Sequence, residues 1–278
     1  MTLASTSGHP RIDRRADWSV GTDAEQQAII DTLRTAGCVA AEDEAALLTG
    51  AAAGDRDRLR ALVERRCTGE PLAWLVGSAR FCDRTVLVHP GVYVPRWQTE
   101  PMALEAVARL PERGCAVDLC TGAGALAVVL AHLRPGARVV ATEIDPLAVA
   151  CARANGVDVL EGDLAAPLPD GLDGQVDVVT AVVPYVPTGE LRLLPRDVLA
   201  HEPRRALDGG DQGIDLLIRA ATAAVGLLRP GGSLLLELGG DQPHLLQPTL
   251  VELGYVDVAL LVDDDGDVRA VTCRARLR

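Results

Sequence analysis

Residues 118–124 read Asp-Leu-Cys-Thr-Gly-Ala-Gly, and their types and spacing favour the binding of a nucleotide-containing cofactor. The apolar run 115–120 is typical of a short buried strand, while residues 125–133 have helical propensity and an apolar face. The glycines therefore fall at a strand-to-helix turn, where Gly122 and Gly124 allow a tight backbone and a close approach by a ligand. The first turn of the helix adds unpaired backbone N–H groups.

Acidic residues beside this turn distinguish its two usual ligands, a dinucleotide and S-adenosylmethionine. Asp118 would repel a pyrophosphate but could meet the ammonium group of a methionine moiety. Glu143 ends a second expected strand, where a carboxylate can accept from both ribose hydroxyls, and Asp163 follows a third, where it could accept from an adenine amino group. Each acid taken alone is explained as well by a helix N-cap or a solvated loop. Acids at the ends of three successive strands favour S-adenosylmethionine, with further cofactor contacts expected from Cys120, Thr121, Ile144, Leu164 and Val182.

Length and composition fit an enzyme of this kind. The chain has 278 residues, 48% of them hydrophobic, which is enough for one sizeable core and a small accessory domain. Aromatic residues make up only 3%, so the core must be built from Ala, Val and Leu. A net charge of -12 argues against direct binding of nucleic acid, since phosphate contacts need a basic surface.

The seven cysteines lack the paired spacing of a zinc site, so we expect free thiols and no metal. No apolar run approaches the roughly 20 residues of a membrane helix, and the first twenty residues lack the apolar core of a signal peptide. These features predict a cytoplasmic protein that does not bind membranes.

Patterns along the chain predict several regions. Residues 1–20 are expected to form a flexible tail and 21–78 a helical domain, with helices over 24–36, 41–53 and 56–66. Residues 79–94 read as a linking β-hairpin. Strands then alternate with helices over 95–278, which predicts a mainly parallel sheet. The last two strands, 255–262 and 268–276, flank an acidic turn and should pair antiparallel.

At this point the sequence resembles the HemK/PrmC-type protein-glutamine methyltransferases, which modify peptide-chain release factors. The resemblance runs from about Leu59 to the C-terminus and includes the loop that begins at Asp118. The other motifs that carry it are Gly69-Glu70-Pro71-Leu72 with Gly77 and Phe81, residues 94–100 (Val-Pro-Arg-Trp-Gln-Thr-Glu), residues 184–187 (Pro-Tyr-Val-Pro) and the stretch 202–215 from Glu202 to Asp215.

This resemblance implies a class I S-adenosylmethionine-dependent methyltransferase fold, Rossmann-like, with a mostly parallel seven-stranded sheet. It also implies S-adenosylmethionine as methyl donor and substrate recognition by the helical N-terminal domain. The acceptor would be a glutamine side chain of a release factor, held beside the end of the fourth strand. Residues expected to bind the acceptor are Arg96, Thr99, Glu100 and Val182.

The chain departs from the family where the family reads Asn-Pro-Pro-Tyr, because the matching residues here are Val182, Val183, Pro184 and Tyr185. An amide nitrogen is a poor nucleophile, so the enzyme must hold it by its two N–H groups. The family asparagine and a backbone carbonyl do this. Val183 can supply the carbonyl, but the Val182 side chain has no acceptor atom. A second departure is Cys120, where the family has glycine.

Another residue could replace the missing asparagine. The candidates for this replacement are Glu202, His201, Thr99 and Glu100, and the residues expected to be catalytic are Val183, Pro184, Tyr185 and Glu202. Ordinary explanations exist for several of them: Glu202 could pair with Arg204, and residues 99–100 look like a helix N-terminus before Pro101.

Three functions remain open from the sequence. The first is an N-methyltransferase related to the release factor enzymes, with an altered acceptor pocket. The second is methylation of a small molecule, such as an amino acid or natural-product intermediate, whose amine needs less help from asparagine. The third is a protein that binds S-adenosylmethionine or a partner without turnover.

Overall fold

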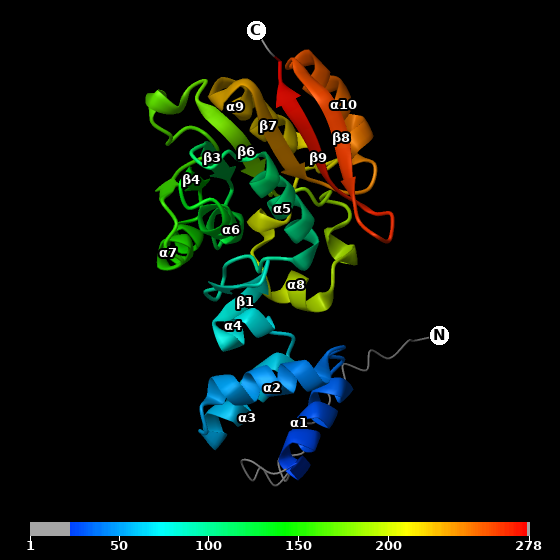
Figure 1. Ribbon diagram of the computed structural model, residues 1–278. Coiled ribbons are helices and arrows are strands. Elements are labelled where there is room, and N and C mark those ends of the chain that lie inside the picture. Colours follow the sequence, from blue (N-terminus) through cyan, green and yellow to red (C-terminus); the bar gives the residue numbers. More distant parts are fainter. Residues whose placement is uncertain (1–22, 277–278) are drawn as a thin grey trace, which may run out of the picture. The chain divides into compact units, whose positions relative to one another are not determined.

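The computed structural model describes residues 23–276, which form two compact units (Figure 1). The first holds the helices up to Val76 together with the short helix α8 (Arg196–His201). The second holds the rest of the chain from Gly77. The sequence placed 95–278 in one domain, whereas the structure groups α8 with the N-terminal helices. The expected tail, 1–20, lies outside the described residues.

The first unit is helical: α1 (Asp23–Thr35), α2 (Ala41–Ala52), α3 (Arg56–Cys67) and α4 (Leu72–Val76) precede α8 in the chain. The carboxylate of Asp55 caps α3 by accepting from the backbone N–H of Arg58 at 3.0 Å. A small apolar core joins the helices and includes Ile29, Leu33, Leu48, Leu59 and Val63.

A short hairpin opens the second unit. Strands β1 (Ser78–Phe81) and β2 (Arg84–Leu87) pair antiparallel around Cys82 and Asp83, whose φ angles of 45° and 58° give the twist that two-residue hairpins favour. The hairpin expected over 79–94 therefore ends at Leu87. His89 and Val92 close a turn around Pro90, which has no N–H to donate to a strand.

The central sheet has seven strands in the order β5-β4-β3-β6-β7-β9-β8. The first five run parallel, whereas β9 pairs antiparallel with β7 and with β8. This confirms the mostly parallel sheet with an antiparallel hairpin at its end. The strands are β3 (Cys115–Leu119), β4 (Arg138–Glu143), β5 (Val159–Glu161), β6 (Val176–Ala181), β7 (Leu228–Glu237), β8 (Tyr255–Val262) and β9 (Val268–Ala275).

Helices cover both faces of the sheet (Figure 1). One face carries α5 (Glu100–Arg109), α6 (Ala125–Leu133) and α7 (Pro146–Ala154), and the other carries α9 (Asp215–Leu227) and α10 (Gln242–Glu252). Single 3₁₀ turns occur at Trp97–Thr99, Asp170–Leu172, Leu191–Leu193 and Arg204–Ala206.

A large apolar cluster fills the space between β6, β7 and helices α9 and α10, and it consists mainly of Leu, Val and Ala. Strand β7 begins at Leu228, directly after α9 and before Gly231 and Gly232. Its pairing with β6 is irregular between Val176 and Val178, where Gly232 approaches the backbone too closely for a side chain. No helix in residues 23–276 is long and apolar enough to cross a membrane.

Candidate functional site

The chain order of the strands locates the site. From β3 the chain proceeds to β4 and β5 on one side, and then returns to β6 on the other side of β3. Open α/β sheets bind ligands at such a switch point, beyond the carboxyl ends of their strands. The loops after β3, β4, β5 and β6 all leave the sheet at this edge, and they carry most of the residues expected to bind the cofactor.

The loop after β3 is held by Asp118. This side chain is fully buried, and its two oxygens accept from the hydroxyl groups of Thr121 at 2.6 Å and Thr180 at 2.7 Å. Burial raises the pKa of Asp118 to about 6, against the effect of these hydroxyl donors. Asp118 thus organises the loop and ties it to β6, while its contact with a ligand stays a prediction.

Glycines allow this loop to turn into α6. Gly122 and Gly124 have φ angles of 58° and 86°, in the left-handed region that favours glycine. A side chain at Gly124 would come within 2.7 Å of Val157, whereas the space beside Gly122 is open for 4 Å. The loop therefore packs tightly on one side and leaves its backbone accessible on the other.

Cys120 occupies the same left-handed region, with φ 56°, although it is not glycine. A residue with a Cβ atom in this conformation carries strain of about 1–2 kcal/mol. Burial, together with the carboxylates of Glu143, Asp118 and Asp163, raises the pKa of this thiol to about 12. The thiol is therefore neutral, and the departure from glycine introduces strain at the centre of the motif.

Glu143 stands at the end of β4 and binds three backbone N–H groups. Oε2 accepts from Gly122 at 2.8 Å, and Oε1 accepts from Ile144 and Asp145, each at 2.9 Å. The carboxylate therefore fixes both the glycine loop and the start of α7. Oε2 retains acceptor capacity, because a carboxylate oxygen has two lone pairs. Beside it, the Ile144 side chain is 60% exposed.

Asp163 follows β5 and forms a half-exposed ion pair with Arg219 at 2.5 Å. The next residue, Leu164, is buried in the apolar core with φ 49°. One oxygen of Asp163 thus already has a cationic partner, and its contact with an adenine remains a prediction.

The segment after β6 is clamped by the stretch 202–215. Val186 pairs with this stretch through hydrogen bonds with Leu207 and Gly209, and Gln242 donates to the carbonyl of Tyr185 at 2.6 Å. A side chain on Gly209 would lie 2.7 Å from the Pro184 carbonyl oxygen, and one on Gly213 would lie 2.1 Å from that of Tyr185. The glycines of this motif are therefore required for close backbone packing around residues 184–186.

Tyr185 points to the end of the neighbouring strand, where its hydroxyl donates to Oε1 of Glu237 at 2.9 Å. Glu237 is the last residue of β7 and only 4% exposed. Burial raises the pKa of both groups, and the neighbouring Glu237 raises that of Tyr185 further. The Tyr185 phenol is therefore a hydrogen-bond donor at neutral pH.

The residues before α5 complete this side of the site. Arg96 forms an ion pair with Glu202, whose carboxylate is almost fully buried and also accepts from the backbone N–H of Val94. The Arg96 guanidinium lies 4.9 Å from the ring centre of Tyr93. Thr99 is buried close to Glu237, while Glu100 begins α5. Glu202 therefore pairs with Arg96, and not with Arg204, whose partner is Asp208.

The structure thus groups Arg96, Thr99, Tyr185 and Glu202 near the ends of β6 and β7, while their expected roles at the acceptor stay predictions. It gives His201 a different neighbour, the ring of Trp74 in the helical unit. Sequence reasoning missed Glu237, Tyr93 and Gln242. Of these, only Glu237 had a usable signal, because it is a single acid at the end of an apolar strand, as Glu143 is.

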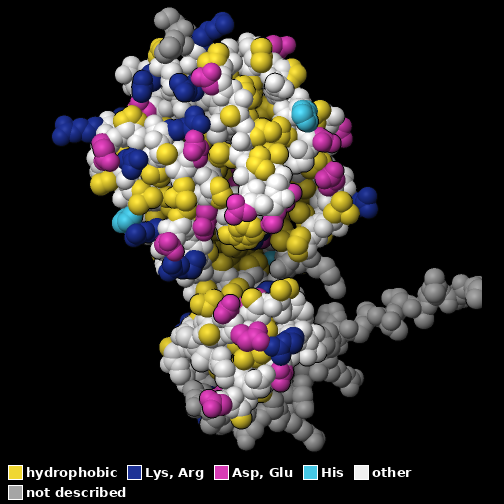
Figure 2. All heavy atoms as spheres, turned by 45° about the vertical axis from the view of Figure 1, so that its right-hand side comes forward, with side chains coloured by type: hydrophobic (Ala, Val, Ile, Leu, Met, Phe, Trp, Pro, Cys, Tyr) yellow, Lys and Arg dark blue, Asp and Glu magenta, His cyan; other side chains and the backbone are white. Residues whose placement is uncertain are grey.

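The charged surface gives no sign of a nucleic-acid interface on the face drawn in Figure 2. Arginine side chains of the described residues are interspersed there with acidic and hydrophobic ones, and they form no continuous basic patch. Residues 23–276 also contain no cluster of histidine, cysteine and carboxylate ligands that could hold a metal ion.

Comparison with known proteins matches residues 84–176 to the methyltransferase small domain. The release factor glutamine methyltransferase of Geobacter sulfurreducens is 37% identical over 218 residues, which cover 76% of both chains. That of Moorella thermoacetica is 43% identical over 230 residues, or 79% of both. A further relative, the 4-amino-L-phenylalanine/4-methylamino-L-phenylalanine methyltransferase of Streptomyces pristinaespiralis, is 40% identical over 191 residues, or 65% of both.

The fold and these similarities agree with one another. The sheet has the strand order and the antiparallel end expected of a class I methyltransferase, and the curated relatives match over most of their length. The protein is a methyltransferase, and it belongs to the family of the release factor glutamine methyltransferases.

Proposed function

We propose that this protein transfers a methyl group from S-adenosylmethionine to a nitrogen atom held beside the end of β6, in the cytoplasm. Bound S-adenosylmethionine supplies a sulfonium-activated methyl group. The residues after β3 and β4 fit this donor: Glu143 has acceptor capacity left for ribose hydroxyls, and the exposed Ile144 offers an apolar surface for the adenine. Open space beside Gly122 allows the approach of the methionine part.

The observation that carries this proposal is the bonding of Glu143. One carboxylate holds the glycine loop and the first residues after β4 together, so that the two segments expected to contact the donor form a single preorganised surface. Preorganised hydrogen-bonding groups bind a ligand with little reorganisation. Asp118 stabilises the same loop by accepting a hydrogen bond from the Thr121 hydroxyl.

The acceptor side supports an altered specificity. Val182 stands where the family has asparagine, so the end of β6 itself offers an amide nitrogen one acceptor, the carbonyl of Val183. The loss of one polar contact in a buried site commonly costs a few kcal/mol, which is on the order of a hundredfold in rate. We therefore propose that glutamine of a release factor is a poor acceptor.

A small-molecule amine is the second candidate acceptor. An amine has a free lone pair, so it does not depend on two acceptors to orient its nitrogen. The Streptomyces pristinaespiralis relative is named for two aromatic amino acids that bear amino groups. Val182 and this relative support an amine as the second candidate.

The deciding experiment incubates the purified protein with radiolabelled S-adenosylmethionine and either purified release factor or a panel of amines that includes 4-amino-L-phenylalanine. We expect labelled amine and little labelled release factor. Efficient labelling of the release factor glutamine would contradict the altered specificity. Calorimetry that shows donor binding, without product from any acceptor, would instead support a non-catalytic protein.

A further inference from the structure

Two buried side-chain oxygens of the second unit have no hydrogen-bond partner within the described residues, the hydroxyl oxygen of Thr142 and one carboxylate oxygen of Glu237, and only the second belongs to an ionisable group. Oε1 of Glu237 is bonded by the hydroxyl of Tyr185, but Oε2 has no such partner. A buried carboxylate oxygen without a donor is costly, because it has given up water without replacing it. A ligand with an N–H or O–H group would satisfy this oxygen.

The cations near Glu237 are already bound elsewhere. Arg96 is paired with Glu202, and Arg269 with Asp263 and Asp267. These two arginines and the hydroxyls of Thr99 and Tyr185 lower the pKa of Glu237, but burial outweighs them and raises it above the usual value. Within the described residues the carboxylate therefore has no ion-pair partner of its own, and a positively charged ligand group would provide one.

The sheet register locates Glu237 relative to the acceptor segment. Ala181 of β6 pairs with Leu236 of β7, so Val182 and Glu237 are the next residues along the two parallel strands. Glu237 also bonds directly with Tyr185, which the family motif places at the acceptor. The unpaired oxygen therefore belongs to the same strand ends from which the asparagine is missing.

We propose that Oε2 of Glu237 binds an N–H group of a primary or secondary amine acceptor and removes a proton from its nitrogen. This inference rests on the proposed function and narrows its acceptor to an amine. An amine that is protonated in solution brings the positive charge that this buried carboxylate lacks. An amide brings no charge, and it needs two oriented acceptors rather than one base.

The proton transfer balances in the following way. For a protonated amine, an N–H bond breaks, its electron pair stays on nitrogen as the lone pair, and the proton forms an O–H bond with Oε2. The lone pair then attacks the methyl carbon, and the electrons of the methyl–sulfur bond remain on sulfur. For a neutral amine the order is reversed, and Oε2 takes the proton that becomes acidic after methylation. In both cases Glu237 later releases one proton to solvent.

Binding measurements test this role without requiring turnover. Calorimetry in the presence of S-adenosylhomocysteine would compare 2-phenylethylamine, 4-amino-L-phenylalanine, 2-phenylethanol and a release-factor glutamine peptide. We expect the unaltered protein to bind at least one amine, and more tightly than the alcohol and the peptide. Glu237→Gln should weaken that binding at least tenfold, while its affinity for S-adenosylmethionine stays within about twofold.

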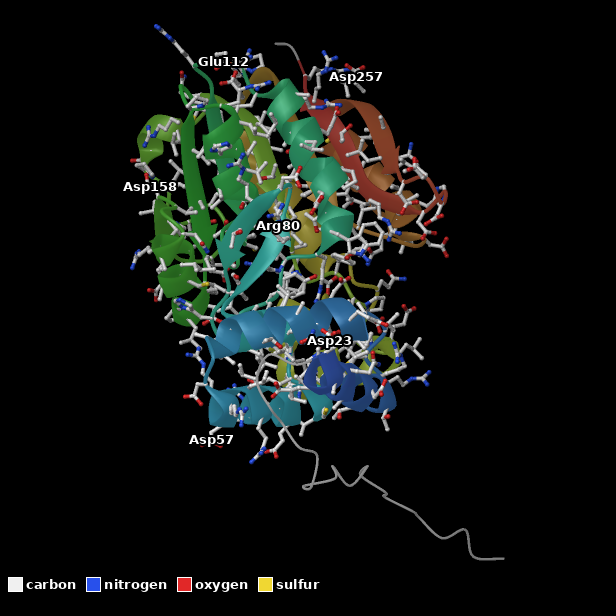
Figure 3. All side chains as sticks on the ribbon, turned by 60° about the horizontal axis from the view of Figure 1, so that its bottom comes forward. Asp23, Asp57, Arg80, Glu112, Asp158 and Asp257 are labelled. Atoms are coloured by element: carbon white, nitrogen blue, oxygen red, sulfur yellow. The ribbon has the colours of Figure 1, made fainter. Side chains whose placement is uncertain are left out.

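Glu112→Gln is the matched control. Glu112 precedes β3, at the opposite edge of the sheet from the strand ends that form the site, and its side chain is 74% exposed (Figure 3). This change should leave both affinities unaltered. Circular dichroism of both variants would establish that they are folded.

The pH dependence of amine binding gives a second readout. The charged groups near Glu237 are Arg96 and Arg269, and the titratable phenols near it are Tyr93 and Tyr185. Glu202 lies on the other side of Arg96 as its ion-pair partner. The arginines stay protonated, and burial keeps both phenols protonated at neutral pH. Amine binding should therefore decrease on the acid side as Glu237 becomes protonated, and Glu237→Gln should abolish that decrease.

Tyr185→Phe separates a positioning role from simple packing. The variant keeps the aromatic ring but loses the hydroxyl donor, which raises the pKa of Glu237 further. The decrease of amine affinity at low pH should therefore begin at a higher pH than in the parent. The inference would be overturned if the pH dependence of amine affinity were the same in Tyr185→Phe as in the parent. It would also be overturned if Glu237→Gln left the amine affinity unchanged. Equal binding of amine and alcohol, or no binding of any amine by the unaltered protein, would have the same consequence.

The failure of this inference can be distinguished from failure of the proposed function. Absence of S-adenosylmethionine binding by the unaltered protein would refute the proposed function itself. Donor binding and amine methylation that proceed equally well in Glu237→Gln would leave that function standing and refute only the role of Glu237.

Discussion

The proposed donor side of the site, formed by the loops after β3 and β4, differs from the proposed acceptor side at the ends of β6 and β7. On the donor side the polar groups of Glu143 and Asp118 have partners inside the protein. On the acceptor side Val182 provides no acceptor atom, and Glu237 keeps an oxygen unpaired. The donor-side carboxylates are thus bonded within the protein, although the buried Thr142 hydroxyl of β4 has no partner within the described residues. On the acceptor side the Glu237 carboxylate itself has an oxygen that a ligand would satisfy.

This difference explains where the chain follows its family and where it departs. A methyl donor that is common to all members of a family can be bound by loops whose conformation is fixed by internal hydrogen bonds. The residues that make these bonds then have little freedom to change. A pocket for a variable acceptor needs to alter only a few side chains at one strand end. Val182 is such a change, and the backbone around it is still held by Gln242 and by the glycines of residues 202–215.

The largest expected effect comes from restoring the family sequence on the acceptor side. Val182→Asn together with Val183→Pro should raise methylation of a release-factor glutamine by about a hundredfold, because the asparagine oxygen supplies the second acceptor for the amide. The measurement is labelled methyl transfer to purified release factor.

Val183→Pro alone is the control for this experiment and should produce little gain, since it adds no acceptor atom. The proposed difference between the two sides would be refuted if the double variant bound the donor but methylated the release factor no faster than the parent. The acceptor side would then lack more than one hydrogen-bond acceptor.

On the donor side, Glu143→Ala should weaken binding of S-adenosylmethionine by about 1.5–3 kcal/mol, roughly ten- to a hundredfold, as expected for bonds to a charged acceptor. The change removes the expected ribose contacts and also leaves the N–H groups of Gly122, Ile144 and Asp145 without their partner. Titration calorimetry measures the affinity.

Glu161→Ala provides the matched comparison, because Glu161 pairs with Glu143 in the register of β4 and β5 but is exposed. It should change the affinity little. Unaltered affinity in Glu143→Ala, or a preference of the parent for a nicotinamide dinucleotide, would refute the assignment of the donor.

The two sides also differ in how well the sequence predicted them. Glycines and strand ends that lie close together in the chain predicted the strand-to-helix turn after β3, because local geometry determines its conformation. The pairing of Arg96 with Glu202 joins residues 106 positions apart, and only the folded structure brings them together. Glu237 was missed because it lies within an apolar strand, although the rule applied to Glu143 also covers it.

Asp118 should make the stability of the protein depend on pH. Its pKa of about 6 in the folded state lies above the ordinary value, so the folded protein binds more protons than the unfolded one between about pH 4 and pH 6. Its favourable contribution is complete below about pH 4 and is lost as the pH rises through 6. The loss is on the order of 3 kcal/mol.

Urea unfolding of the parent and of Asp118→Asn between pH 4.5 and 7.5 would detect this contribution. The stability of the variant relative to the parent should increase with pH, because the amide does not ionise. Asp158→Asn removes an exposed carboxyl group and is the control (Figure 3). Parallel profiles for the parent and Asp118→Asn would show that Thr121 and Thr180 compensate fully for burial.

The smallest effect concerns Cys120, the one departure from the family on the donor side. Its left-handed backbone costs about 1–2 kcal/mol, and glycine in its place would lose about 0.5–1 kcal/mol through chain entropy. Cys120→Gly should therefore stabilise the protein by up to about 1 kcal/mol, a rise in Tm of roughly 2 °C. Calorimetric melting measures the shift. Cys67→Gly, at the end of α3 and without a positive φ, should lower Tm instead. A lower Tm for Cys120→Gly would mean that packing of the thiol against the core outweighs the strain, and that the donor side has adapted to cysteine rather than merely tolerating it.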